Sequence, residues 1–205
     1  MTPMNSGRIA GMVLLCCAIF AAVGILEKGA GAAEEKSAPK VTVTSELDHQ
    51  LTLAEKEFVS AAEAMPEEKY SFAPASGEFK GVRTFAGQVR HVAFVNFLFF
   101  NAVLGEERPE GVGNEGPQSV KTKDQLLRYL LESFAAGHRA IAAMKPGTMV
   151  TPVSKPPNPR YTTPLAVTFH AVAHAYNHYG QMVEYLRMNG IVPPATVARN
   201  AASAQ

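Results

Sequence analysis

The chain has 205 residues, 47% of them apolar, and a formal net charge of +1, which fits one globular domain with short extra segments. This near neutrality argues against nucleic acid or an anionic membrane surface as a partner, because both attract an excess of basic side chains. The two cysteines, Cys16 and Cys17, lie in an N-terminal apolar run. The rest of the chain has no thiolate, so a metal there must be held by nitrogen and oxygen ligands.

Residues 1–33 are predicted to be a signal peptide. A mostly apolar run over residues 9–26 follows Arg8, and small residues at 29–33 offer a cleavage pattern. The alternative is an uncleaved anchor, since a run of this length just spans a bilayer, and a membrane would then be a partner through this segment alone. In either case we expect an extracytoplasmic location, periplasmic or secreted.

The remaining chain divides into three parts. Residues 34–45 are predicted to form a charged tether, and residues 191–205 a disordered tail. The domain between them, residues 46–190, has apolar residues at helical spacing. It is predicted to hold four helices, over about residues 46–64, 84–104, 122–144 and 163–190.

Capping residues support these helix starts. Ser45 is the expected N-cap of the first helix, and Thr122 with Gln125 has the spacing of a capping box. Thr163 precedes Pro164, the order expected where Pro takes the first helical position. The second helix is apolar nearly all round over residues 92–100, so we expect it to be the most buried.

The fold class follows from the periodicity. No segment alternates between apolar and polar residues over a useful length, so the protein is predicted to be all-α, a four-helix bundle. The long connections leave the helix order open, and their Gly and Pro residues suit loops that roof a site in the bundle core. They cover residues 65–83, 105–121 and 145–162.

Three histidines, His170, His174 and His178, follow one another at intervals of four residues on the fourth helix. Residues at this spacing share one helix face, and two such imidazoles can bind a single metal ion. One ion cannot bind both His170 and His178, whose side chains start about 12 Å apart. We expect His174 and His178 to bind, and His170 to pack near the helix start or face solvent.

His91 is the candidate for a third ligand, because it lies in the otherwise apolar second helix. A buried polar group without a partner costs about 1–3 kcal/mol, so this imidazole needs a partner. The alternative to a metal is a hydrogen bond to a backbone carbonyl or water. His49 and His138 have charged or small neighbours and are predicted to lie at the surface.

Several familiar metal sites are excluded. Zinc proteases need a Glu directly after the first histidine of the pair, and Ala171 and Ala175 occupy these positions. Di-iron bundles need Glu-x-x-His on two helices, whereas this chain has it once, from Glu46 to His49, and haem attachment through Cys-x-x-Cys-His is impossible. What remains is a mononuclear three-histidine site with an open position, as in catalytic metal sites.

With these residues in place, the chain resembles the DinB-like (DNA-damage-inducible B, YfiT-like) family of metal-binding four-helix bundles. The resemblance extends over about residues 46–194. It rests on His91, on the segments 65–72 and 183–190, and on the element His174-Ala-Tyr-Asn-His178-Tyr-Gly-Gln181.

The resemblance implies a divalent metal, zinc or nickel, held by His91, His174 and His178. It further implies an up-down-down-up helix order and, in many members, a homodimer. Better understood members are thiol S-transferases or thiol-dependent isomerases, whose metal activates a small thiol. For this chain the resemblance therefore suggests a thiol or another small molecule as the substrate.

Three interpretations remain open. The first is a metal-dependent enzyme of the thiol S-transferase or hydrolase type, and the second a non-catalytic metal-binding module outside the cytoplasm. The third is a plain helical bundle whose histidines fill polar gaps in the core. Polar groups near the expected ligands are Gln88, Tyr176, Asn177 and Gln181, and none of them is an evident proton carrier, so no catalytic residue is identified.

Overall fold

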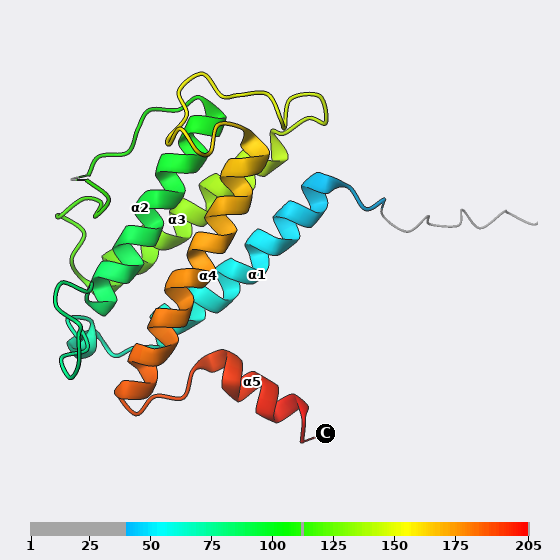
Figure 1. Ribbon diagram of the computed structural model, residues 1–205. Helices are drawn as coiled ribbons and strands as arrows, with labels where there is room; N and C mark the ends of the chain where they lie inside the picture. Colours follow the sequence, from blue (N-terminus) through cyan, green and yellow to red (C-terminus); the bar gives the residue numbers. More distant parts are fainter. Residues whose placement is uncertain (1–39, 112, 205) are drawn as a thin grey trace, which may run out of the picture. The chain divides into compact units, whose positions relative to one another are not determined.

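The computed structural model describes residues 40–111 and 113–204, so the predicted signal segment lies outside the described residues. No strand occurs in the part of the chain that is described, and the fold is all-α as predicted. The elements, shown in Figure 1, are α1 (Val43–Ala64), the short 3-10 helix η1 (Glu67–Lys69), α2 (Phe85–Leu104), α3 (Lys123–Ala142), α4 (Pro164–Met188) and α5 (Pro194–Ala202).

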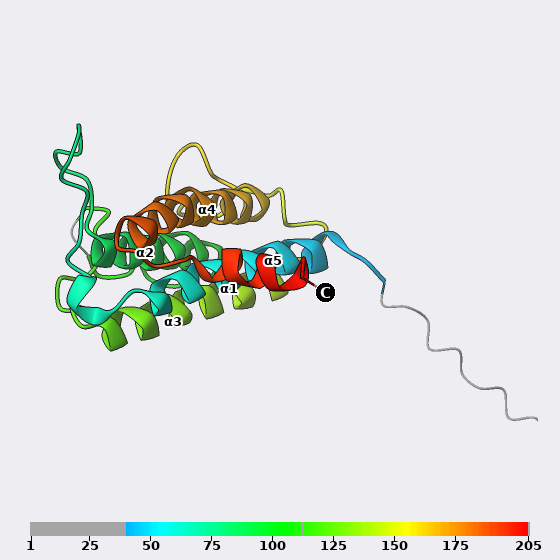
Figure 2. The same ribbon diagram turned by 90° about the horizontal axis from the view of Figure 1, so that it is seen from below.

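The four long helices form a bundle in which α1 and α2 each pack against both α3 and α4. Helices α3 and α4 barely touch, and Figure 2 shows them on opposite sides of α1 and α2. This arrangement places α2 and α4, which carry the candidate histidines, side by side.

The helix directions follow from contacts along each pair. Phe97 of α2 lies against Tyr129 of α3, and Glu106, just beyond α2, pairs with Arg139 further along α3. Helices α2 and α3 are therefore parallel, whereas α1 and α4 run in the opposite direction (Figure 1). The order is the up-down-down-up arrangement that the resemblance implies.

The helix starts are set by threonine N-caps. Thr122 and Thr163 accept hydrogen bonds from the amides of Gln125 and Ala166, as expected for α3 and α4. The first helix differs from the prediction, because Thr42 is its N-cap and Ser45 forms the other half of the capping box. Helix α1 therefore starts within the segment predicted to be a tether.

The C-terminal segment also differs from the prediction. Residues 191–205 were expected to be disordered, but Pro194–Ala202 forms α5, which packs along α1. The paired prolines suggested a helix breaker, whereas Pro at the first helical position is compatible with a helix and the alanines that follow favour one. Gly190, with φ of 75°, makes the turn between α4 and α5.

Helix α2 is the most buried element, as its apolar sequence predicts. Even so, no helix among the described residues is both long and apolar enough to cross a membrane. Phe100 of α2 packs into the core at the point where α3 comes close to α1. The close packing of α3 is possible because residue 137 is a glycine. A Cβ at position 137 would lie 2.7 Å from both the Leu51 and the Phe100 side chains.

We expect Gly137→Ala to lower the free energy of unfolding by about 1 kcal/mol, since overpacking outweighs the gain in helix propensity. Gly180 of α4 has no atom within 4 Å of the corresponding position. Gly180→Ala is therefore expected to raise the free energy of unfolding by about 0.5–1 kcal/mol. Urea denaturation of both variants measures the difference, and equal effects would contradict the packing at Gly137.

His138 is only partly exposed, whereas the prediction from its small neighbours placed it at the surface, and His49 is exposed as expected. The ring of His138 lies between α3 and α1, with Nδ1 2.6 Å from Asp48 Oδ1 and Nε2 3.0 Å from Glu55 Oε2. Burial lowers the pKa of His138, but the hydrogen bonds to the two carboxylates outweigh it, so the pKa is raised. The imidazolium thus links the two helices.

Because its pKa is higher in the folded than in the unfolded chain, His138 stabilises the fold fully below about pH 6.5 and progressively less as the pH rises through its folded pKa. His138→Gln should therefore lower the free energy of unfolding more near about pH 5.5 than near about pH 8.5. We expect the difference between the two pH values to be at most about 1 kcal/mol, because the group is partly exposed. Urea unfolding at both pH values measures this, with His49→Gln as the control. A pH-independent cost would contradict the ionic link.

Candidate metal centre

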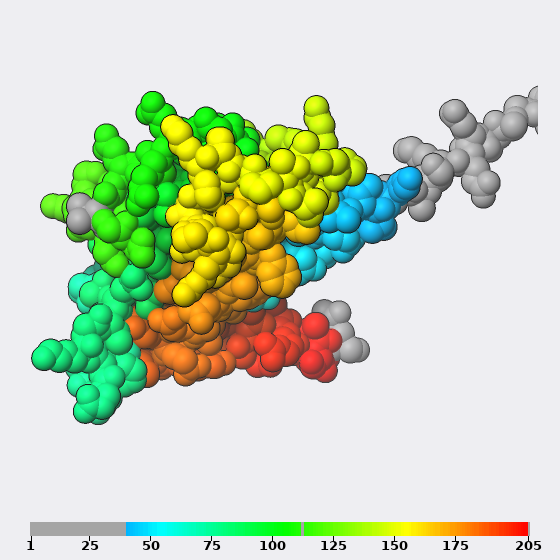
Figure 3. Space-filling view, turned by 45° about the horizontal axis from the view of Figure 1, so that its top comes forward, coloured from blue at the N-terminus to red at the C-terminus, as the bar shows by residue number. Residues whose placement is uncertain are grey.

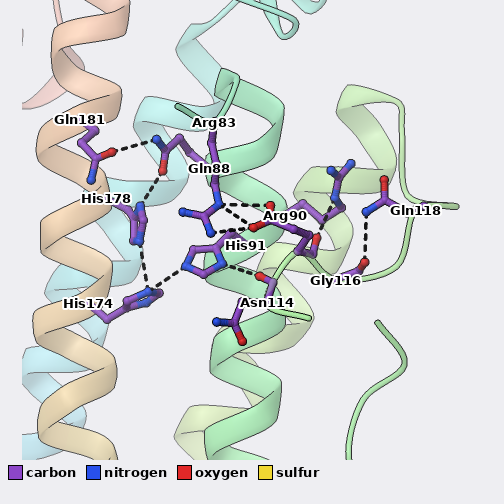
Figure 4. Close-up of polar contacts among 11 residues, drawn as sticks. Arg83, Gln88, Arg90, His91, Asn114, Gly116, Gln118, His174, His178 and Gln181 are labelled. Atoms are coloured by element: carbon purple, nitrogen blue, oxygen red, sulfur yellow. Dashed lines mark hydrogen bonds and ion pairs between the residues drawn. The ribbon is translucent and has the colours of Figure 1, made fainter. Parts of the chain in front are cut away.

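Three imidazoles converge between α2 and α4. His91 projects from α2, and His174 and His178 project from neighbouring turns of α4 (Figure 4). The Nε2 atom of His174 lies 3.1 Å from Nε2 of His91 and 3.1 Å from Nε2 of His178. All three ligand atoms lie within 4.8 Å of one another, so these histidines can hold one metal ion.

The spacing of the nitrogens suits a metal ion. Ligands at ~2.0–2.1 Å around a tetrahedral ion are about 3.3 Å apart, close to the two Nε2–Nε2 distances of 3.1 Å. The i, i+4 spacing on α4 supplies one pair, and the antiparallel packing of α2 supplies the third group. The three residues that the sequence singled out are thus brought together.

Hydrogen bonds fix the outer nitrogens of two of the rings. His91 Nδ1 lies 2.5 Å from the backbone oxygen of Asn114, and His178 Nδ1 lies 2.5 Å from Gln88 Oε1. Since a carbonyl oxygen only accepts, His91 carries its proton on Nδ1 and presents a lone pair at Nε2. The same holds for His178 with Gln88 as acceptor, and Gln88 in turn donates to Gln181 Oε1 at 2.9 Å.

His174 lacks such an outer partner. Its Nδ1 is buried and has no hydrogen-bond partner among the described residues. With lone pairs of His91 and His178 both facing its Nε2, a neutral His174 can donate only one proton there. Without a bound cation, at least one buried nitrogen of the three rings remains unsatisfied.

The electrostatic surroundings keep the imidazoles neutral. Burial lowers the pKa of His174 to about 3 and that of His178 to about 4, and it also lowers the pKa of His91. The charge of Arg83 acts in the same direction on all three rings. Neutral imidazole is the form that binds a metal, so the lone pairs are available at neutral pH.

The connection between α2 and α3, residues 105–122, forms one wall of the centre. Arg83 donates from Nε and Nη2 to the Glu115 carboxylate, with a shortest distance of 2.7 Å, and Arg90 Nε donates to the backbone oxygen of Glu115 at 2.9 Å. A Cβ at Gly111 would lie 2.5 Å from the Phe94 ring, so the loop lies directly on α2. These contacts hold the Asn114 carbonyl against His91.

Two cavities are relevant to the site. One, of about 480 Å³, adjoins the centre and is lined by Gly81, Val82, Arg83, Gln88, Glu115 and Gln181. A larger one, of about 600 Å³, lies at the other end of α2. Neither lining includes a histidine of the centre, but the first cavity is lined by Gln88, which is hydrogen bonded to His178. We therefore associate the smaller cavity with the candidate centre.

Comparison with known proteins identifies the family. Residues 50–182 match the family model described as the DinB superfamily. The chain belongs to this superfamily. The bundle is also similar to the crystal structure of a conserved protein from Enterococcus faecalis, with a TM-score of 0.58 and 18% identity over 72% of this chain and 97% of that one. No curated protein matches.

The DinB match spans His91, His174 and His178, the positions at which the resemblance implied a metal. His170 lies one turn further toward the start of α4, where its ring stacks on Tyr161 at a centroid distance of 3.9 Å. This packing near the helix start is one of the roles that the sequence left open for it.

Other polar groups take supporting positions. Asn177 is exposed and its Oδ1 accepts a hydrogen bond from Gln181 Nε2, while Tyr176 packs against Tyr179. Sequence reasoning missed two contributions to the centre, namely the Asn114 carbonyl and the Arg83–Glu115 pair. A backbone carbonyl leaves no signal in the side-chain pattern, and an ion pair across a loop has no fixed spacing.

The Asn114 contact predicts the tautomer of His91. In metal-free protein at neutral pH, ¹⁵N NMR is expected to show His91 protonated at Nδ1 and unprotonated at Nε2, since only the Nδ1–H can donate to the carbonyl. The exposed His49 serves as the reference ring. Protonation of His91 at Nε2 would contradict the orientation described here.

Proposed function

We propose that this DinB-superfamily protein binds a divalent metal ion, zinc or nickel, through His91, His174 and His178. We further propose that it is an exported metal-dependent enzyme of the thiol S-transferase or hydrolase type that acts on a small molecule. The carrying observation is the convergence of three imidazole Nε2 atoms from two helices within 4.8 Å. Export rests on the composition of residues 1–33, and a homodimer on the family resemblance.

The donor set fits such an ion. Two Nε2 atoms present lone pairs whose direction is fixed by outer hydrogen bonds, as is usual for metal-ligating histidines. A cation between the three Nε2 atoms would accept all of their lone pairs, whereas one N–H of His174 can satisfy only one of the two lone pairs that face it. This favours a metal over a plain bundle whose histidines only fill polar gaps.

The chemistry would be divided between metal and protein. A divalent ion on three neutral imidazoles supplies a Lewis acid with a position open to a substrate or water. Asn114 and Gln88 keep His91 and His178 oriented. The adjoining cavity, of about 480 Å³, has room for a small molecule beside the centre, and this supports an enzyme.

A non-catalytic metal-binding module is the second candidate. Of the residues that line the adjoining cavity, Glu115 has the only carboxylate, and this group is engaged by Arg83. Proton transfer from a positioned side chain is therefore not built into the cavity walls. A protein that senses, buffers or docks a metal needs no such group.

Removal of one ligand tests metal binding. The purified protein is expected to contain about one equivalent of zinc or nickel, and His174→Ala to lose it, because two imidazoles rarely retain an ion. His170→Ala is the matched control, since His170 is one turn away and stacks on Tyr161 instead. Elemental analysis measures the content, and metal-free wild-type protein would contradict the proposal.

Activity assays separate the two candidates. Metal-loaded protein is screened against small thiols with electrophilic acceptors and against simple esters. Turnover that is lost in His174→Ala and kept in His170→Ala supports the enzyme. Stoichiometric metal without turnover of any of these substrates favours the binding module.

A further inference from the structure

The cavity beside the candidate metal centre is lined by residues from four parts of the chain, most of them polar. Gly81, Val82 and Arg83 come from the connection before α2, Gln88 from α2, Glu115 from the 105–122 connection and Gln181 from α4. In Figure 3 these connections, in teal and green, lie next to α4, in orange, on one face of the molecule. Arg83 is the only cationic side chain in this lining.

The guanidinium of Arg83 is held in a fixed orientation on one edge. Its Nε donates to both carboxylate oxygens of Glu115 at 3.1 Å, and its Nη2 donates to one of them at 2.7 Å. The backbone of Glu115 is itself fixed by Arg90. The ion pair therefore positions the guanidinium as well as neutralising part of its charge.

The other edge of the guanidinium is available. Nη1 makes no hydrogen bond to any described residue, and the three donor contacts to Glu115 involve only Nε and Nη2. Figure 4 shows one guanidinium nitrogen directed away from these contacts, toward the space between α2 and α4. A planar guanidinium offers its second edge to another carboxylate with the same geometry.

This edge faces the centre. Figure 4 shows the Arg83 guanidinium beside the His91 ring, on the side of α2 that faces α4. Gln88 lines the same cavity while it orients His178. The lining of one cavity thus contains both Arg83 and a residue that is in contact with the centre.

We propose that Arg83 is the specificity-determining residue of this cavity and binds the carboxylate of a small ligand whose other end reaches the metal. The proposal rests on the metal site proposed above and adds the class of substrate: a small molecule with a carboxylate. Glu115 is a positioning residue that holds the guanidinium in place. Gln88 and Gln181 add amide groups suited to a polar ligand rather than an apolar one.

Two matched probes test the proposal. 3-Mercaptopropionate carries a thiol and a carboxylate, and 3-mercaptopropionamide has the same size without the charge. Isothermal titration of the zinc-loaded full chain should show the carboxylate binding at least about tenfold more tightly than the amide, the factor expected for a charge-assisted contact.

Variants assign the preference to Arg83. Arg83→Gln should reduce the affinity ratio of the two probes to near one, and Arg83→Lys, which keeps the charge but lacks the planar fork, should give an intermediate ratio. Arg128→Gln on exposed α3 removes the same charge outside the cavity and should leave the ratio unchanged. Zinc content of each variant, measured first, shows that the centre is intact.

The outcomes distinguish this proposal from the metal site on which it rests. Zinc-loaded protein that binds both probes equally contradicts the role of Arg83 and leaves the metal site standing. A carboxylate preference that persists in Arg83→Gln also contradicts it, since the preference then arises from chelation of the ion alone. Protein without zinc contradicts both the metal site and the carboxylate proposal.

Discussion

The antiparallel packing of α2 against α4 is the constraint on which the candidate centre depends. It places His91 level with His174 and His178, and the same register brings Gln88, one turn earlier on α2, to His178 and Gln181. A slip of one helical turn, about 5.4 Å, would separate every one of these pairs. The apolar face of α2 fixes its register against α4, and this register sets the positions of the imidazoles. The centre is thus a result of core packing.

The 105–122 connection adds one wall to the centre that lies between these two helices. Its glycines allow close contact with α2: at Gly116, φ is 70° and a Cβ would meet Phe94 at 3.0 Å. That contact brings the backbone carbonyl of Asn114 to His91. Because α2 and α3 are parallel, the 105–122 connection must run back along the bundle from the end of one helix to the start of the other. On this path it passes the histidines.

Much of this arrangement could be predicted from the sequence, and the failures have physical causes. Helical periodicity and threonine caps gave three of the four long helices nearly to the residue, and the four-residue spacing of histidines identified the α4 ligands. The start of α1 was misplaced because Ser is the more strongly preferred N-cap type, whereas the structure uses Thr42 as the cap and Ser45 as its N3 partner. Helix α5 was not predicted because Pro193 and Pro194 were given more weight than the alanines that follow them. The link from His138 to α1 was not predicted because it depends on tertiary packing alone.

The charge of the donor set bears on what the centre can bind. Three neutral imidazoles leave a divalent ion its full charge, whereas carboxylate ligands would offset it. Arg83 adds a positive charge at the same cavity and Glu115 a negative one, so the two side chains offset each other and the charge of a bound ion would remain. With the proposed ion in place, such a cavity would attract anions and disfavour cationic ligands. A small anionic molecule is therefore the class of ligand that agrees with both the metal centre and the lining of its cavity.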